Sequence, residues 1–136
     1  MDPAEQPPMT RNIDCAKLNA AMDAWPGAWK VTDGDVTMGR RIVEGMRPFV
    51  VALVAKGMSR STINRHLNNL WLLGGEIIAR AHRDARLHRK KEQELLQTFV
   101  DDEGGPLCQH NTTEAEQRAF DSTCRRLHRF LARSLR

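Results

Sequence analysis

Apolar residues recur along this chain at intervals of three and four, which is the spacing of one face of an α-helix. Four segments show this pattern: residues 13–24, residues 33–57, a long run that begins near Ser59, and residues 113–135. No stretch of useful length alternates between apolar and polar residues, as a half-buried strand would. The pattern therefore predicts an all-α protein.

The run that begins near Ser59 has the strongest periodicity. Ser59 or Ser61 is expected to cap its start, because a serine hydroxyl can accept a hydrogen bond from the free backbone N–H groups there. We expect the helix to continue through an arginine-rich stretch to about Val100. Gly74-Gly75 is the point where it can bend or let another helix pack closely. The apolar stripe consists of Ile63, Leu67, Leu70, Trp71, Gly74, Ile77, Ile78 and Ala81.

Proline and capping residues set the expected limits of the first two helices. Asn12 is a candidate N-cap for the first helix, and Pro26-Gly27 is expected to end it. Trp25 and Trp29 flank that turn and are expected to pin the first helix onto the rest of the protein. Pro48 lies inside the second apolar pattern, so we expect a kink or a break into two helices there.

The last helix has a clear start signal. Residues 101–111 contain two glycines and a proline and are expected to form a loop. Thr112 or Thr113 follows as a cap, and Glu116 occupies the third position of a capping box. The apolar side of this helix consists of Ala119, Phe120, Cys124, Leu127, Phe130 and Leu131.

Length and composition agree with a small globular protein. The 136 residues are 40% hydrophobic and 28% charged, which is enough to form a core without a metal or a disulfide. Residues 1–10 contain three prolines and are expected to be a disordered tail, followed by a single helical domain over residues 11–136. The predicted fold is a compact all-α bundle of about five helices with one long central helix.

Charge is distributed unevenly along the chain. Residues 1–59 carry no net charge, residues 60–91 carry +6, residues 92–117 carry −7 and residues 118–136 carry +5, which together give the overall +4. The acidic segment can neutralise the two basic ones within the fold, or the basic segments can form an exposed face for phosphates. The sequence leaves both arrangements open.

The stretch from Phe49 to Leu70, FVVALVAKGMSRSTINRHLNNL, resembles the N-terminal core-binding (SAM-like) domain of phage integrases and other tyrosine recombinases. The shared pattern is an apolar helix, a Lys-Gly turn at Lys56-Gly57, a serine cap and a basic helix with leucines at matching spacing. The resemblance implies a SAM-like or helix-turn-helix-like core that clamps duplex DNA. The chain contains no tyrosine, so it lacks the nucleophile of that family, and the resemblance implies the DNA-clamping part alone.

Polar residues beside the apolar stripe are the first candidate DNA contacts. Arginine and asparagine form paired hydrogen bonds with guanine and adenine edges, arginine also binds phosphate, and a helix start favours anions. The alternative is an ordinary solvated helix face. The candidates are Arg60, Ser61, Asn64, Arg65 and Asn68.

A second group of basic residues follows the apolar stripe. In a continuous helix a spacing of three places Arg80, Arg83 and Arg86 along one side, where they could follow a phosphate backbone. Arg89 and Lys90 extend this group. Solvation of the charges, or pairing with the acidic segment, is again the alternative.

The sequence offers no enzyme signature and no expected cofactor. It has no phosphate loop, no dinucleotide-binding glycine motif and no HExxH, and its five histidines are scattered. Cys108, His110, Cys124 and His128 are ligand types that suit tetrahedral zinc, but Cys124 falls on an apolar stripe, where a buried thiol needs no metal. We therefore expect no metal site.

The expected setting is cytoplasmic, because no apolar stretch is long enough to span a membrane and the three cysteines are an odd, widely spaced set. DNA is the expected partner, without a membrane or a small-molecule substrate. The alternative is a protein-interaction module, either a homodimeric adaptor or a mobile-element regulator that binds a recombinase. In that case the last helix and the Leu/Ile stripe would bind the partner.

Overall fold

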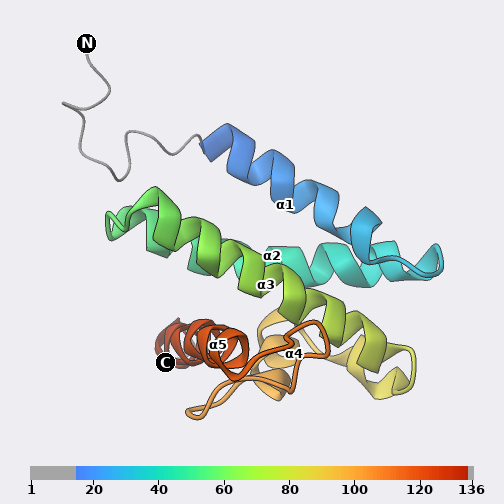
Figure 1. Ribbon diagram of the computed structural model, residues 1–136. Helices are drawn as coiled ribbons and strands as arrows, with labels where there is room; N and C mark the ends of the chain where they lie inside the picture. The colour runs from blue at the N-terminus through green and yellow to red at the C-terminus, as the bar shows by residue number, and fades with distance from the viewer. Residues whose placement is uncertain (1–14, 135–136) are drawn as a thin grey trace.

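The computed structural model describes residues 15–134, in which the chain is all helical (Figure 1). The described residues contain no β-strand, only an isolated bridge between Asp101 and Gly104. The predicted tail and the Asn12 cap lie outside the described residues. The helices are α1 (Cys15–Trp29), α2 (Gly34–Ala55), α3 (Arg60–Ala81), the 3-10 helix η3 (Ala85–Arg89), α4 (Glu92–Phe99) and α5 (Glu114–Ser134).

Helices α2 and α3 form a hairpin at the centre of the bundle. α2 packs against α1, α3 and α4, and α5 packs against α3 and α4. In Figure 1, α1 therefore lies on one side of α3 and α5 on the other. The predicted all-α bundle is confirmed.

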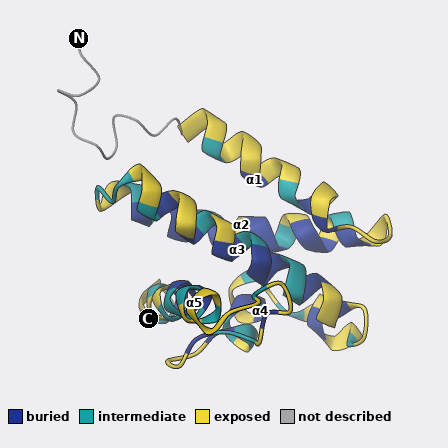
Figure 2. Cartoon of the chain, in the orientation of Figure 1, coloured by how far each residue is buried: buried dark blue, intermediate teal, exposed yellow. Residues whose placement is uncertain are grey.

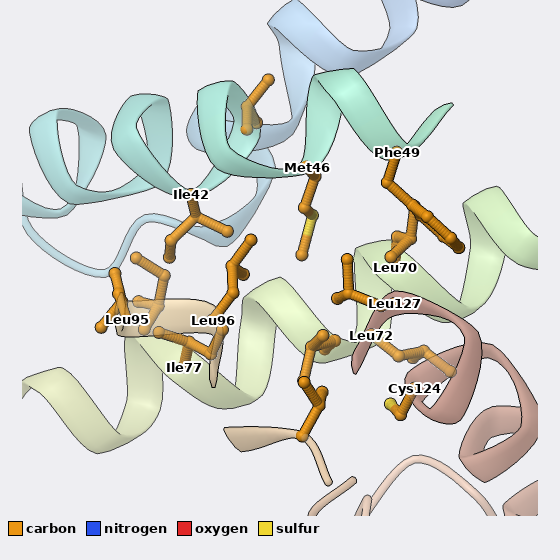
Figure 3. Packing of buried hydrophobic residues seen from close by; sticks show 14 of the residues in the cluster. Ile42, Met46, Phe49, Leu70, Leu72, Ile77, Leu95, Leu96, Cys124 and Leu127 are labelled. Carbon is orange, nitrogen blue, oxygen red and sulfur yellow. The ribbon is translucent and has the colours of Figure 1, made fainter. Parts of the chain in front are cut away.

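One hydrophobic core joins all five α-helices. Because apolar side chains recur at helical spacing, each helix turns one apolar side inward. α2 contributes Ile42 and Met46, α3 contributes Leu70 and Ile77, and α5 contributes Leu127 (Figure 3). These five side chains are fully buried. The Leu/Ile stripe of the sequence is thus core.

The hairpin turn follows the capping pattern in the sequence. Gly57 has a φ of 74°, a left-handed conformation that glycine adopts without a steric penalty. Ser59 Oγ accepts a hydrogen bond from the Thr62 N–H at 3.1 Å, which satisfies one of the free donors of the first turn. Pro48 does not break α2, which runs as a single helix from Gly34 to Ala55.

Pro26 does not end α1, contrary to the sequence prediction. The helix continues to Trp29, although a proline inside a helix removes one backbone hydrogen bond. Its ring packs tightly on Gly39 of α2, where a Cβ would lie 2.9 Å from Pro26 Cβ. The Trp29 indole Nε1–H donates to the Trp71 carbonyl at 2.9 Å, and its ring lies over Gly74. This tertiary packing compensates for the proline, and Trp29 pins α1 as predicted.

The long helix predicted to reach Val100 ends instead at Ala81. Asp84 then caps η3 by accepting from the Arg86 N–H at 3.0 Å. Arg41 of α2 donates to the carbonyl oxygens of His88, at 2.9 Å, and of Lys90. In a continuous helix those carbonyls would be bonded to the following turn; after the break they accept from Arg41 instead, which ties the segment to α2.

The loop between α4 and α5 is fixed by two side chains of α5. Asp121 accepts the backbone N–H of Gly105 at 3.1 Å, and Gln117 accepts that of Cys108 at 3.1 Å and donates to the Pro106 carbonyl at 3.2 Å. The loop is therefore ordered on α5 rather than free.

The predicted capping box starts α5. The Glu116 N–H donates to Thr113 Oγ1 at 3.1 Å, while the Glu116 carboxylate accepts from the Thr112 N–H at 3.2 Å.

Candidate nucleic-acid interface

The five predicted contacts near the start of α3 all lie on its surface. Arg60, Ser61, Asn64, Arg65 and Asn68 are exposed, and Figure 2 shows exposed and buried stretches alternating along α3. The opposite side of the same turns carries Ile63 and Leu70 into the core. The sequence thus separated the core side of α3 from its solvent side correctly.

A buried polar cluster joins α3 to α5. His66 Nδ1 lies 2.8 Å from Thr123 Oγ1. Asn69 Nδ2 donates to the same hydroxyl at 2.9 Å and to the Ala119 carbonyl at 3.2 Å. All three side chains are buried, and buried polar groups that are hydrogen-bonded to one another specify one packing arrangement. The cluster therefore fixes which sides of α3 and α5 meet.

Two arginines converge beside this cluster, one from each helix. Burial lowers the pKa of His66 below the usual 6.5 of a histidine, and the positive charges of Arg126 and Arg65 lower it further. Arg65 directly precedes His66 on α3, and Arg126 lies three residues after Thr123 on α5, so the His66–Thr123 hydrogen bond brings together the turns that carry these two arginines. Neither arginine forms an ion pair within residues 15–134. Like charges gathered without a carboxylate favour binding of an external anion.

α5 carries further arginines on its exposed side. The described part of the chain pairs Arg118 with Glu114 at 3.7 Å, and Arg125 donates to the Glu103 carbonyl at 3.2 Å. Arg126, Arg129 and Arg133 are exposed and have no ion pair there. We call the joined surface the α3–α5 face; it consists of Asn64, Arg65, Asn68, Arg126, Arg129 and Arg133.

The sequence prediction omitted the α5 arginines, although a signal for them was present. Arg126, Arg129 and Arg133 are spaced by three and four residues, which places them on one helical side. Phe120 and the other core residues of α5 occupy the opposite side. Helical spacing alone could therefore have found this row, but its position beside α3 depends on the tertiary fold.

The predicted ridge of Arg80, Arg83 and Arg86 does not exist. Arg80 ends α3, Arg83 lies in the following turn and Arg86 belongs to η3, because the helix breaks after Ala81. Arg86 also pairs with Asp84 at 3.0 Å.

The rest of this group lies outside α3. Arg89 is exposed at the end of η3, and Lys90 follows it. Arg65 and Arg80 are about 22 Å apart along α3, at the helical rise of about 1.5 Å per residue. The structure therefore separates the two predicted groups.

The acidic segment pairs with the second basic segment at Glu114 and Arg118, but it does not neutralise the first one pair by pair. In residues 15–134, no carboxylate of residues 92–117 forms an ion pair with a basic residue of residues 60–91. Glu92 instead pairs with Arg41 at 3.2 Å, and Asp101 accepts backbone N–H groups of its own turn. Glu116 is used in the capping box. The basic residues of α3 keep their charge exposed.

The cysteine and histidine set considered for zinc does not come together. The described residues contain no group of three His, Cys, Asp or Glu side chains that could hold a metal ion. Cys108 and Cys124 are buried, and His110 is exposed. Burial raises the pKa of the Cys124 thiol, as does the nearby Asp121 carboxylate. A buried thiol with a raised pKa is an inert core side chain.

Comparison with known proteins gives no relative. No protein-family model, no curated protein and no solved structure matches this chain. Among the described helices, none is long and apolar enough to cross a membrane.

Proposed function

We propose that this chain binds duplex DNA through the phosphate backbone, using the α3–α5 face. The observation that carries the proposal is the His66–Thr123 hydrogen bond at 2.8 Å, which brings together the turns of α3 and α5 that carry the exposed Arg65 and Arg126. Within residues 15–134 neither arginine is paired with a carboxylate. Arginine guanidinium groups bind phosphate oxygens in a paired geometry, and phosphate contacts dominate DNA affinity. Asn64 and Asn68 lie on the same face with the chemistry to contact base edges.

The resemblance of residues 49–70 to a recombinase core-binding domain supports the same function. In that family the helical domain holds DNA, and the α2–α3 hairpin has the turn that the resemblance implies. The exposed polar side of α3 then lies toward DNA, and the α5 arginines hold the backbone. The chain is proposed to bind DNA without cutting it.

Fluorescence anisotropy with a labelled random duplex at low salt tests this proposal. The double variant Arg65→Ala/Arg126→Ala should bind at least tenfold more weakly, because each lost phosphate contact lowers affinity. Arg40→Ala is the matched control, since Arg40 is exposed on α2 beside α1, and it should bind as the unmodified chain does. Absence of binding at low salt by a folded sample would refute the proposal, and an unchanged double variant would refute this face.

Protein interaction is the second candidate function, but its surface differs from the one expected. The Leu/Ile stripe and the apolar side of α5 are buried within one chain. An apolar groove of about 240 Å³ lies between α1 and α2, lined by Leu18, Val50 and Val54 among others. Val51 at this groove is 63% exposed. Light scattering should give the mass of a dimer if the groove binds a second copy, and Val51→Lys should restore the monomer.

A further inference from the structure

A cleft opens on the C-terminal half of α3, at the far end of the side that carries the α3–α5 face. It has a volume of about 350 Å³ and lies between the end of α1, α3 and residues 109–110 of the loop. This volume is within the range of small-molecule sites, about 300–1,000 Å³. Asn68, Gly75 and Ala79 are spaced by seven and four residues, so the cleft continues the exposed side of α3.

The apolar wall of the cleft is built from two tryptophans. Trp29 and Trp71 both line it, and the hydrogen bond from Trp29 Nε1 to the Trp71 carbonyl, at 2.9 Å, fixes the Trp29 indole. Gly75 and Ala79 lie beside them on α3 and present no side chain large enough to fill the space. Trp29 is only 7% exposed and Trp71 is half-buried, so the cleft offers mainly the accessible part of the Trp71 side chain, with open space for another ring beside it.

The polar rim supplies a hydrogen-bond acceptor and a cation. Glu76 lines the cleft and accepts the Gln109 N–H at 3.4 Å, which connects the loop wall to α3. Arg83 lies at the end of the cleft, is exposed, and has no ion pair in the described chain. A flat ring that carries donors and is attached to an anion matches these groups; this is the chemistry of a nucleotide.

We propose that this cleft binds one unstacked nucleotide, with its base against Trp71 and its phosphate on Arg83. The proposal extends the proposed DNA binding, because a duplex held on the α3–α5 face would place an unpaired end along the same side of α3. The occupant is either a base at a single-stranded end or a free nucleotide, which have the same base and phosphate chemistry.

Three probes test the cleft: a blunt duplex, the same duplex with a short single-stranded extension, and deoxyadenosine monophosphate. Because stacking of one base on an aromatic side chain contributes about 1–3 kcal/mol, the extension should tighten binding about tenfold. Alternatively, the mononucleotide should quench tryptophan fluorescence, which identifies a free nucleotide as the occupant. Either effect should be lost in Ala79→Leu, which fills the cleft, and be weakened in Arg83→Ala.

Ala85→Leu is the matched control, because Ala85 is an exposed alanine on η3 outside the cleft, and it should behave as the unmodified chain does. If neither the extension nor the mononucleotide gives an effect that Ala79→Leu removes, the cleft is not a nucleotide site. Blunt-duplex binding should be the same in Ala79→Leu and in the unmodified chain. If the unmodified chain does not bind the blunt duplex but its tryptophan fluorescence is still quenched by the mononucleotide, the α3–α5 face is refuted and the cleft remains supported.

Discussion

Replacing Gly74 with alanine tests the packing of α1 on α3. A Cβ at position 74 would lie 2.1 Å from Trp29 Cζ2 and 2.3 Å from Cη2, so the indole must move. Trp29 is only 7% exposed, and its displacement also breaks the hydrogen bond to the Trp71 carbonyl. The adjacent Gly75 differs, because its Cβ would lie 3.6 Å from the nearest Trp29 atom, which is an ordinary contact.

The expected magnitude follows from three effects. Overpacking costs about 1–3 kcal/mol and the lost hydrogen bond about 1 kcal/mol, while alanine gains about 1 kcal/mol over glycine inside a helix. Gly74→Ala should therefore lower the free energy of unfolding by about 2 kcal/mol, from these same overpacking, hydrogen-bond and propensity values. Gly75→Ala should raise it by up to about 1 kcal/mol.

Thermal unfolding followed by circular dichroism measures the difference. The two variants should differ by about 3 kcal/mol, or about 10 °C in Tm for a chain of this size. In a Trp29→Ala background the cost of Gly74→Ala should disappear, because no indole then occupies the space. Equal stability of the two single variants would refute the placement of Trp29 over Gly74.

Four further predictions concern α3, α5 and their connections. Ser59→Ala removes the cap of α3 and should lower the free energy of unfolding by about 1 kcal/mol in denaturant titration. An unchanged free energy of unfolding would contradict the cap. Burial and two arginines lower the pKa of His66 from 6.5, so the unfolded chain binds a proton at this histidine more readily than the folded chain does. The free energy of unfolding should therefore be highest above about pH 6.5 and fall as the pH is lowered below it. His66→Gln should lessen that fall. Arg126→Ala should raise the His66 pKa in an NMR titration, and an unchanged pKa would place Arg126 away from the ring. Asp121→Ala should speed amide exchange at Gly105, and unchanged exchange would show that other contacts hold the loop.

Local signals predicted most of the helix boundaries. Gly57, Ser59 and the Thr113–Glu116 capping box act through backbone groups of the same few residues, so the sequence is enough to find them. The apolar stripe of α3 was likewise predicted, because burial of one helix side requires helical spacing.

The errors arose where distant residues decide the structure. No glycine or proline occurs between Ala81 and Lys91, so nothing local indicated the end of α3. The break is stabilised by Arg41, about fifty positions earlier, which donates hydrogen bonds to the backbone carbonyls of residues 88 and 90. Pro26 was expected to end α1 because proline is a local stop signal. The packing on Gly39 that accompanies its place inside the helix is a tertiary contact, which the sequence does not show.

The candidate site was predicted in part for the same reason. The exposed residues of α3 follow from spacing, whereas the meeting of Arg65 with Arg126 depends on the buried contact between His66 and Thr123. That contact joins residues 57 positions apart, which no local pattern indicates.

The salt dependence of duplex binding tests the central claim most directly. For a protein that binds DNA phosphates, log K falls linearly with log salt with a slope of about −0.9 per phosphate contact. The Arg65→Ala/Arg126→Ala variant should reduce the magnitude of this slope by about two, while Arg40→Ala leaves it unchanged. Equal slopes for the double variant and the unmodified chain would contradict the assignment of the α3–α5 face as the DNA-binding surface.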